Sequence, residues 1–380
     1  MSSVNFLEKL LDGAEVEWLP LGKTLVRTKG TKITAGQMKE IHKDGAPVKI
    51  FAGGKTVAFV DFEDIPKNDI NHKPSIIVKS RGVIEFEYYD KPFSHKNEMW
   101  SYHVGDKTVN IKYVYHFLKM NEPYFQNLGS KMQMPQIATP DTDKFEIPIP
   151  CPDNPKKSLV IQAEIVRILD NFTELTAELT AELTARKKQY QHYRDQLLSF
   201  SDGQVEWKKL GDVATIGTGS HDTQDAIDGG KYTFYARGRE PLRLNEFDFD
   251  ETAIITAGDG AGVGKVFHYA QGKYAVHQRA YRIVPCASMN PRFVFHCIKS
   301  HFYAYIQKAS VSSSVTSLRR PMFLNFPIPN PPLTEQDRIV DILDKFDTLT
   351  DSLTEGLPRE IALRQQQYEY YRDALLSFPR

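Results

Sequence analysis

Two segments of this chain carry apolar residues at intervals of three and four positions, which is the spacing of one face of an α-helix. The first, Gln162–Phe200, keeps this stripe from Ile165 to Leu197, and the second, Gln336–Phe378, repeats it. A solvated single helix does not keep one apolar stripe over so many turns, so the pattern predicts that the two helices pair. The expected pairing positions are leucines, namely Leu175, Leu179, Leu183, Leu349, Leu353 and Leu357.

The two helical segments are copies of one another. Both open with the pattern Q-x-x-I-V-x-I-L-D-x-F and close with Y-R-D-x-L-L-S-F. Their surroundings repeat as well, because a tryptophan (Trp18, Trp207) lies near the start of each preceding region and a Pro-rich stretch closes it. The chain is therefore expected to alternate globular part, helix, globular part, helix. Both tryptophans are expected to anchor a core, and Gly356 with Pro358 should kink or interrupt the second helix.

The regions outside the helices have a different texture. Short apolar and β-branched runs alternate there with Gly, Asp and Asn turns, which is typical of strands, and 293–306 is a further helix candidate. We predict an α+β fold in which two mixed α/β domains are separated by two long antiparallel coiled-coil helices, with a pseudo-two-fold internal repeat. The expected divisions are an N-terminal helical cap at 1–13, globular domains at 14–158 and 203–332, and helices at 159–200 and 333–378.

Charge and composition narrow the class of protein. Lys and Arg total 48, as do Asp and Glu, so the net charge is zero and a general polycation is excluded. The helical segments hold 15 acidic and 10 basic residues, which leaves 33 acidic and 38 basic residues elsewhere. That basic excess fits phosphate contact by the globular parts, with statistical scatter as the alternative.

The remaining composition points to a soluble protein. The three cysteines lack paired spacing, so neither a disulfide framework nor a structural zinc site is expected. No apolar stretch is long enough for a membrane span, and the first residues lack the pattern of a secretory signal. A cytoplasmic location without membrane contact is expected.

Catalytic motifs fail when they are compared position by position. The glycine-rich run Gly258–Lys265 has Asp259 and Val266 where a phosphate-binding P-loop needs Gly and Ser or Thr. It is either a plain turn between strands or a backbone loop that approaches DNA. Asn330-Pro-Pro-Leu333 lacks the aromatic residue that ends the N-P-P-aromatic signature of amino-methyltransferases. No catalytic residue and no metal ligand is predicted.

Candidate DNA contacts are polar loop residues of both globular regions. Arg and Gln can read guanine and adenine bidentately in the major groove, and basic side chains contact phosphate. An ordinary solvated surface is the alternative at each position, and the same holds for Lys131 before the first Pro-rich exit. The candidates are Lys79, Arg81, His95, Lys96, Arg237, Arg239, Arg243, Gly260, Gly262, Lys265, Gln278, Arg279, Arg319 and Arg320.

Together, the repeat, the Ile-Pro-x-Pro exits, the helix-entry pattern and the T-A-E-L tetrads resemble the specificity (S) subunit of type I restriction–modification systems. The tetrads look like those of the type IC subclass, and the resemblance covers essentially the whole chain. It implies that each globular domain reads one half of a bipartite, asymmetric site in double-stranded DNA. It also implies two modification (M) subunits and restriction (R) subunits as partners, which carry S-adenosylmethionine, ATP and Mg, with no cofactor in this chain.

Within this resemblance the helices set the spacer between the half-sites and dock the methyltransferase subunits. Each tetrad adds about 6 Å to a helix, which corresponds to one or two base pairs. Two other classes stay open: a coiled-coil adaptor without DNA binding, and a self-contained DNA methyltransferase. Salt-dependent DNA binding in the presence of the M subunit would exclude the adaptor, and unaided methyl transfer would indicate the enzyme.

Overall fold

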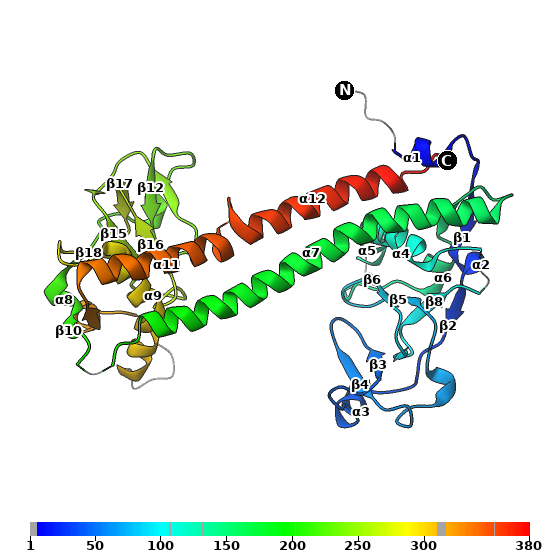
Figure 1. The fold of residues 1–380 in the computed structure, drawn as a ribbon, viewed down its shortest axis with the longest axis horizontal. Helices are drawn as coiled ribbons and strands as arrows, with labels where there is room; N and C mark the ends of the chain where they lie inside the picture. The colour runs from blue at the N-terminus through cyan, green and yellow to red at the C-terminus, as the bar shows by residue number, and fades with distance from the viewer. Residues whose placement is uncertain (1–5, 106–107, 131–132, 202, 310–316, 353) are drawn as a thin grey trace. The chain divides into compact units, whose positions relative to one another are not determined.

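The computed structural model describes residues 6–105, 108–130, 133–201, 203–309, 317–352 and 354–380. The chain forms two compact units (Figure 1). The first comprises Met1–Glu178 and Ile361–Arg380, and the second comprises Leu179–Glu360. Each unit therefore holds one globular domain together with part of each long helical segment.

The long helical segments fold as the apolar stripes predict. Helix α7 spans Pro155–Leu197 without interruption. The second segment consists of α11 (Leu333–Asp351) and α12 (Gly356–Leu376). The chain leaves the helical conformation at Ser352, and Gly356 has a φ of +74°. The interruption expected near Gly356 and Pro358 is confirmed.

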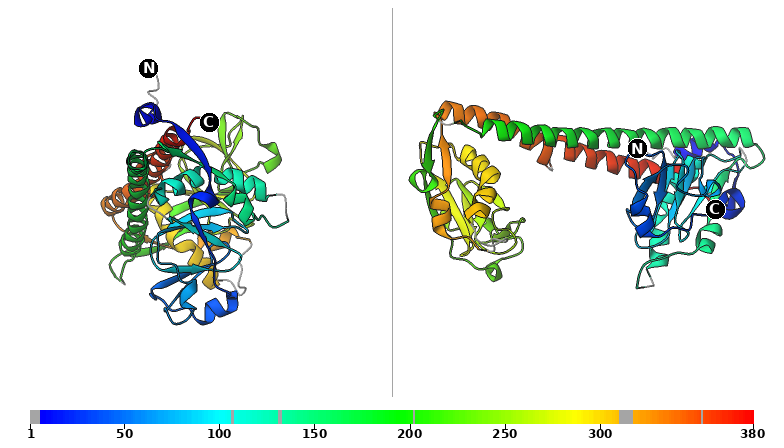
Figure 2. Two further views of the ribbon diagram at one scale, coloured as in Figure 1. Left: turned by 90° about the vertical axis from the view of Figure 1, so that its right-hand side faces the viewer. Right: turned by 90° about the horizontal axis from the view of Figure 1, so that it is seen from below.

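In the second unit, α7 packs against α11 through aromatic rings and charges. Tyr190 stacks on Phe346 with ring centroids 5.7 Å apart, and Lys187 Nζ lies 3.7 Å from Asp351 Oδ1. Because residue numbers rise along α7 while those of their partners fall along α11, the two helices are antiparallel, as predicted. Figure 2 shows α7 in green beside α11 in orange.

The first unit repeats the stacking of Tyr193 on Phe346, whose ring centroids are 5.8 Å apart in the second unit. Phe172 of α7 stacks on Tyr371 of α12 with ring centroids 5.1 Å apart. Helix α1 (Phe6–Leu11), which lies within the predicted cap at 1–13, places the ring of Phe6 at 6.0 Å from Tyr371. Rings therefore join the helices in both units.

The predicted pairing leucines differ in burial. Leu357 is buried, with 8% of its surface exposed, whereas the others that can be assessed are half-buried. Leu353 lies outside the described residues. The half-buried leucines are Leu175, Leu179, Leu183 and Leu349. The contacts described above are ring contacts and one ion pair, so pairing through leucines stays a prediction.

The first domain contains two sheets and a separate strand pair. The sheet orders are β2-β8-β5-β6 and β4-β3-β7, and β1 pairs antiparallel with β9. Strands β3 and β7 run parallel to one another. The strands are β1 (Val16–Pro20), β2 (Val26–Thr28), β3 (Val48–Phe51), β4 (Val57–Val60), β5 (Ser75–Lys79), β6 (Glu85–Tyr89), β7 (Phe93–His95), β8 (Trp100–His103) and β9 (Glu146–Pro150). The helices are α2 (Leu21–Thr24), α3 (Ala35–Glu40), η1 (Lys67–Asp69), α4 (Ile111–Met120), α5 (Glu122–Gly129) and α6 (Thr139–Asp143).

The second domain repeats this topology. Its sheet orders are β11-β18-β15-β16 and β13-β12-β17-β14, β12 runs parallel to β17, and β10 pairs with β19. The strands are β10 (Glu206–Lys209), β11 (Ala214–Thr218), β12 (Tyr232–Tyr235), β13 (Leu242–Leu244), β14 (Phe249–Asp250), β15 (Ala253–Ala257), β16 (Phe267–Ala270), β17 (Lys273–Val276), β18 (Ala280–Pro285) and β19 (Pro327–Asn330). The helices are α8 (Leu210–Val213), η2 (Thr223–Asp225), α9 (Pro291–Ala309) and α10 (Arg320–Leu324). The α+β prediction is confirmed, and α9 is the helix predicted at 293–306.

One helix covers each main sheet and closes the core. In the first domain α4 packs against β5 and β6, with Tyr113 and Phe117 buried. In the second domain α9 packs against β15, β16 and β18, with Phe293 and Phe302 fully buried. Each such ring contributes about 1.5–3 kcal/mol by leaving water. Among the described residues, no helix is long and apolar enough to cross a membrane.

The two tryptophans behave differently. Trp18 lies edge-on to Phe117 at 5.9 Å, and its indole N–H donates to the Pro379 carbonyl at 3.0 Å. Trp207 is 46% exposed. The core-anchor prediction is wrong for Trp207. Trp18, in contrast, is covered by the C-terminal residues, which belong to the first unit.

Candidate nucleic-acid interface

Three loops of the second domain meet at one edge. They are the loops 236–241, 258–266 and 277–279, which follow β12, β15 and β17. The backbone N–H of Gly258 donates to Arg279 O at 2.8 Å, and that of His277 donates to Tyr235 O at 3.0 Å. His268 Nε2, on β16, lies 3.0 Å from the Gly238 carbonyl oxygen. These bonds join the loops into one surface, here called the second-domain platform.

A single carboxylate lies between two arginines on this platform. Asp259 accepts hydrogen bonds from Arg237 at 2.9 Å and from Arg279 at 3.2 Å. The Arg237 guanidinium is the main cause of the lowered pKa of Asp259, with a smaller contribution from Arg279. Both arginine side chains stay open to water, at 41% and 64% exposure. Two forked donors are thus held in fixed orientation at the surface.

The loop that carries Asp259 is the glycine-rich run. It connects β15 to β16, as the turn interpretation predicts, and a cavity of about 450 Å³ lies beside it. Gly260 is exposed and Gly262 half-buried in the wall of this cavity, while Lys265 is exposed and lies over the ring of Tyr303. Approach of this loop to DNA stays a prediction.

Gln278 is also positioned by an acid. Its amide nitrogen donates to Asp222 Oδ2 at 2.8 Å, and this bond is the main cause of the lowered pKa of Asp222. The side chain of Gln278 is exposed. The bond to Asp222 fixes which end of the amide donates, so the oxygen and the second N–H stay available to a ligand.

The remaining arginines fall into two groups. Arg243 donates to Gly230 O, Lys231 O and the Thr233 hydroxyl, so its guanidinium braces its own hairpin. These bonds use three of its five N–H donors, and the residue is exposed, so DNA contact by Arg243 stays a prediction. Arg239 is exposed and lines the 450 Å³ cavity. Arg319 and Arg320 are exposed and follow Leu318, whose N–H bonds to Gly258 O.

The first domain corrects two predictions. Lys79 is 7% exposed, and its ammonium pairs with Glu85 at 2.6 Å and with Glu87 at 2.8 Å. His95 is fully buried, with Nδ1 at 3.2 Å from the Lys96 carbonyl. Neither side chain can reach DNA from these positions. Both residues lie at the ends of strands. The burial of the apolar run before Lys79 extends to Lys79 itself.

The exposed candidates of the first domain form a second surface. Arg81 is exposed and Lys96 half-buried, and Lys96 pairs with Glu98 at 2.6 Å. Burial raises the pKa of Glu98, but the bond from Lys96 and the nearby charge of Arg81 lower it overall. The loops 80–84 and 96–99, here called the first-domain platform, thus carry two cations near one acid. Lys131 lies outside the described residues.

The two platforms occupy the same place in the repeated topology. In the first domain, the backbones of Arg81 and Gln136 form an isolated antiparallel β-bridge, and those of Thr31 and Lys96 form a parallel one. In the second domain, Asp259 and Ser317 form the antiparallel β-bridge, and His221 and His277 form the parallel one. The loop sequences carry no visible repeat, so this correspondence is a property of the fold.

Sequence reasoning missed a pair of polar links at the helix entries. His116 Nε2 lies 2.9 Å from Asp170, and its counterpart His296 lies 2.7 Å from Asp344. Lys112 and Arg292 bind the same two carboxylates. The Asp of the repeated pattern I-L-D-x-F was visible, but its histidine partner lies on a distant helix.

The cluster of His296, Asp344 and Asp347 has the atom spacing of a metal site. Arg292 binds both carboxylates, at 2.7 and 3.3 Å, and Lys299 lies 3.6 Å from Asp347. Two protein cations already balance the two acids. The cluster therefore joins a domain to a helix rather than holding a metal ion.

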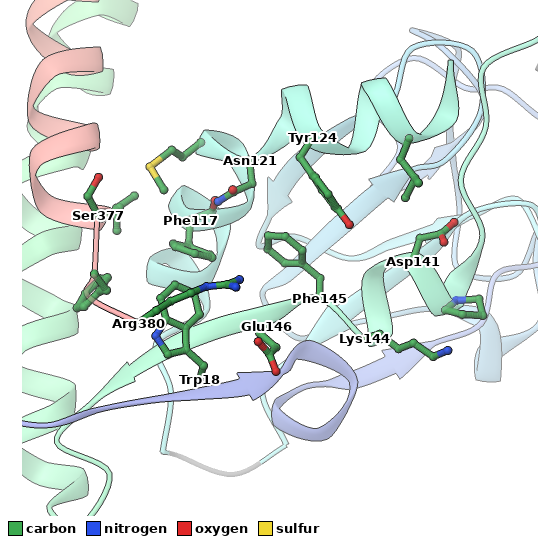
Figure 3. A pocket seen from close by; sticks show the side chains of 15 residues that line it. Trp18, Phe117, Asn121, Tyr124, Asp141, Lys144, Phe145, Glu146, Ser377 and Arg380 are labelled. Atoms are coloured by element: carbon green, nitrogen blue, oxygen red, sulfur yellow. The ribbon is translucent and has the colours of Figure 1, made fainter. Parts of the chain in front are cut away.

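A separate groove lies in the first unit beside the C-terminus. Its volume is about 760 Å³, and Figure 3 shows the rings of Trp18, Phe117, Tyr124 and Phe145 along it. Arg380 lies over the Trp18 ring at 5.2 Å. The other charged groups at its rim are Asp141, Lys144 and Glu146. These side-chain charges cancel, so the groove lacks the positive character of a DNA surface.

The fold and the platforms define a class: an internally duplicated protein with two related but chemically unlike surfaces. The family model for the type I restriction modification DNA specificity domain matches this chain twice, over residues 32–186 and 204–363. The chain belongs to this family.

The sequences of known relatives match this chain over all or nearly all of its length. The chain is 38% identical to the type I restriction enzyme EcoR124I/EcoR124II specificity subunit of Escherichia coli, covering 100% of this chain and 98% of the relative. It is 33% identical to the EcoprrI specificity subunit of Escherichia coli, covering 93% of each. The solved S subunit of a type I restriction-modification system from M. genitalium has a TM-score of 0.69 at 16% identity, over 97% of this chain and 98% of that one. This last likeness is one of fold alone.

Proposed function

We propose that this chain is the DNA-recognition subunit of a type I restriction–modification enzyme and performs no catalysis itself. Each globular domain reads one half of a bipartite, asymmetric site in double-stranded DNA. The observation that carries this proposal is the repeated platform, which presents cations beside a carboxylate at the same strand ends of both domains. Membership of the DNA specificity family supports it.

Equal topology with unequal side chains supports two different half-sites. The first-domain platform offers Arg81 and Lys96, and the second offers Arg237, Gln278 and Arg279. A Lys ammonium is a point charge, whereas Arg and Gln present paired groups that match particular base edges. Two such surfaces would select unlike sequences although they share one fold.

The partners follow from the same proposal. Two modification subunits would supply methyl transfer with S-adenosylmethionine, and restriction subunits would supply ATP- and Mg-dependent cleavage. A solved chain of similar fold, with a TM-score of 0.55 at 14% identity, comes from a study of complex assembly in the type I R-M system. The long helices would dock the modification subunits, and the T-A-E-L tetrads support assignment to the type IC subclass.

A domain exchange tests independent reading. Residues 14–158 are replaced by those of a relative, and methylated sites are mapped in cells carrying either protein together with its modification subunits. One half-site should change, and the half read by the second domain should stay the same. Change in both halves would contradict independent reading.

Two binding measurements separate the rival classes. The chain assembled with its modification subunits should bind DNA with an affinity that falls steeply with salt, because phosphate contacts release counterions. A coiled-coil adaptor would show no such binding. The chain alone with S-adenosylmethionine and DNA should transfer no methyl group, whereas transfer would indicate a self-contained methyltransferase.

A further inference from the structure

The glycine-rich loop of the second-domain platform is shaped to lie between two arginines. A Cβ at Gly258 would stand 2.5 Å from the Arg279 carbonyl, and one at Gly262 would stand 2.6 Å from the Arg237 carbonyl. Side chains at either position would push the loop away. Asp259 lies in the stretch between these two close approaches and binds both guanidinium groups. The backbone and the carboxylate thus act on the same pair of residues.

Stability alone does not account for this arrangement. Exposed ion pairs contribute little to stability because water screens them, and Arg279 is 64% exposed. Two long side chains lose rotamer freedom on being held, which offsets part of that gain. What the contact does provide is a fixed direction for two forked donors beside a surface cavity of about 450 Å³.

The carboxylate also indicates which DNA group is contacted. Asp259 offsets one of the two arginine charges and so weakens their attraction for phosphate, whereas Arg239 and Lys265 are exposed cations of the same loops that can make that contact. A guanidinium fork matches O6 and N7 of guanine in the major groove. The two oriented arginines therefore match guanine, and so a G·C pair.

We propose that Asp259 is a positioning residue that orients Arg237 and Arg279 to read guanine in the half-site of the second domain. This rests on the proposed function, and it assigns that half-site at least one G·C pair. Arg237 and Arg279 supply the base contacts, and Asp259 fixes their directions.

The test uses the full chain assembled with its modification subunits and a library of DNA with random sequence. Methylated molecules are sequenced, and the preference at each position is compared between variants. The wild-type complex should select a G·C pair in the second-domain half-site. Asp259→Asn should weaken that preference about 10- to 100-fold while keeping overall binding, because both arginine charges remain.

The matched control is Glu246→Gln, which makes the same charge change at an exposed position of the same domain. It should leave the base preference unaltered. Arg279→Lys keeps the charge and removes the fork, so it should relax the same position even if Asp259→Asn folds poorly. The half-site of the first domain serves as an internal reference in every variant.

The outcomes separate the two proposals. A wild-type complex that neither binds nor methylates DNA would refute the proposed function itself. A wild-type complex that selects a bipartite site without G·C pairs in the second half would refute only the guanine assignment. A base preference for Asp259→Asn equal to that for Glu246→Gln would refute the positioning role, and an unchanged preference for Arg279→Lys would refute the base contact by Arg279.

Discussion

Asp170 and Asp344 hold the same place in the two helix-entry patterns, and each binds a histidine and a cation from its globular domain. Asp344 accepts from His296 and Arg292, both at 2.7 Å. Burial raises the pKa of Asp344, but the bonds from His296 and Arg292 lower it overall. Each aspartate therefore ties a domain to the long helix that follows it.

Replacing Asp344 by asparagine should lower the free energy of unfolding of the second unit by about 1–3 kcal/mol, because His296 and Arg292 lose their carboxylate while staying largely buried. Urea denaturation measures the difference. Asp341→Asn is the matched control, since Asp341 is exposed on the same helix. That control should change stability by less than about 0.5 kcal/mol. Equal losses in both variants would contradict the linking role.

His95 makes the stability of the first domain depend on pH. Burial lowers the pKa of His95 below its ordinary value of 6.5, and the hydrogen bond to the Lys96 carbonyl and the charge of Asp69 oppose this shift without reversing it. The unfolded chain then binds a proton more readily than the folded one, so stability is full above about pH 6.5 and declines as the pH falls toward the lowered pKa. This direction is opposite to that of a histidine which gains an acidic partner on folding.

Urea denaturation of wild type and His95→Gln at pH 7.5 and 5.5 measures this dependence. The variant should have a lower free energy of unfolding than the wild type at pH 7.5. This difference should shrink at pH 5.5, because only the wild type must deprotonate His95 in order to fold. His72→Gln, at an exposed position, should leave the pH dependence unchanged. A constant deficit at both pH values would exclude His95 as the cause.

At the residue scale, sequence reasoning found polar positions but not their exposure. Arg81, Arg279 and Gln278, which are candidate DNA contacts, are exposed. Lys79 and His95 belong to the same kinds of loop boundary, yet pairing with Glu85 and Glu87 covers Lys79, and β8 covers His95. Burial at a strand end depends on how the next strand folds back against it, which the sequence does not show even though the covering residues lie only six to eight positions away.

At the scale of elements, the break between α11 and α12 depends on one glycine. Gly356 has a φ of +74°, and a Cβ there would stand 2.4 Å from the Thr348 carbonyl. Gly356→Ala should lower the free energy of unfolding by about 2–4 kcal/mol, from unfavourable φ and steric overlap together. Gly229→Ala, with a φ of +71° and open space around it, should lose only about 1 kcal/mol. Calorimetry or denaturation compares the two, and equal losses would exclude the close approach as a cause.

Elements were predictable where a pattern persisted along the chain. The stripe of α7 continues over many turns, and Gly356 and Pro358 mark the break before α12. Strands such as β5 and β15 are short apolar runs in the sequence, but no local pattern indicates which strands lie beside them. The parallel pairs β3 with β7 and β12 with β17 join residues far apart in sequence, so no local pattern specifies them.

At the scale of the whole molecule, the tetrads of α7 are proposed to set the distance between half-sites. Deleting Thr176–Leu179 removes four residues, or about 6 Å of helix, and about 40° of rotation. We expect the spacer of the recognised site to shorten by one or two base pairs while both half-sites keep their sequences. Mapping methylated sites measures this, and altered bases within either half-site would contradict the spacer role.

The amino-acid sequence by itself determined the duplication, the long helices, their interruption and the family, because these depend on periodicity and on repeated local patterns. Tertiary structure decided which loops share a platform, which of their charged residues are exposed, and that Asp259 stands between Arg237 and Arg279. Those arginines are separated by more than forty residues, and only the pairing of β12 with β17 and of β15 with β18 brings them to one carboxylate. Contacts made by distant strand ends follow from packing, which no local pattern records.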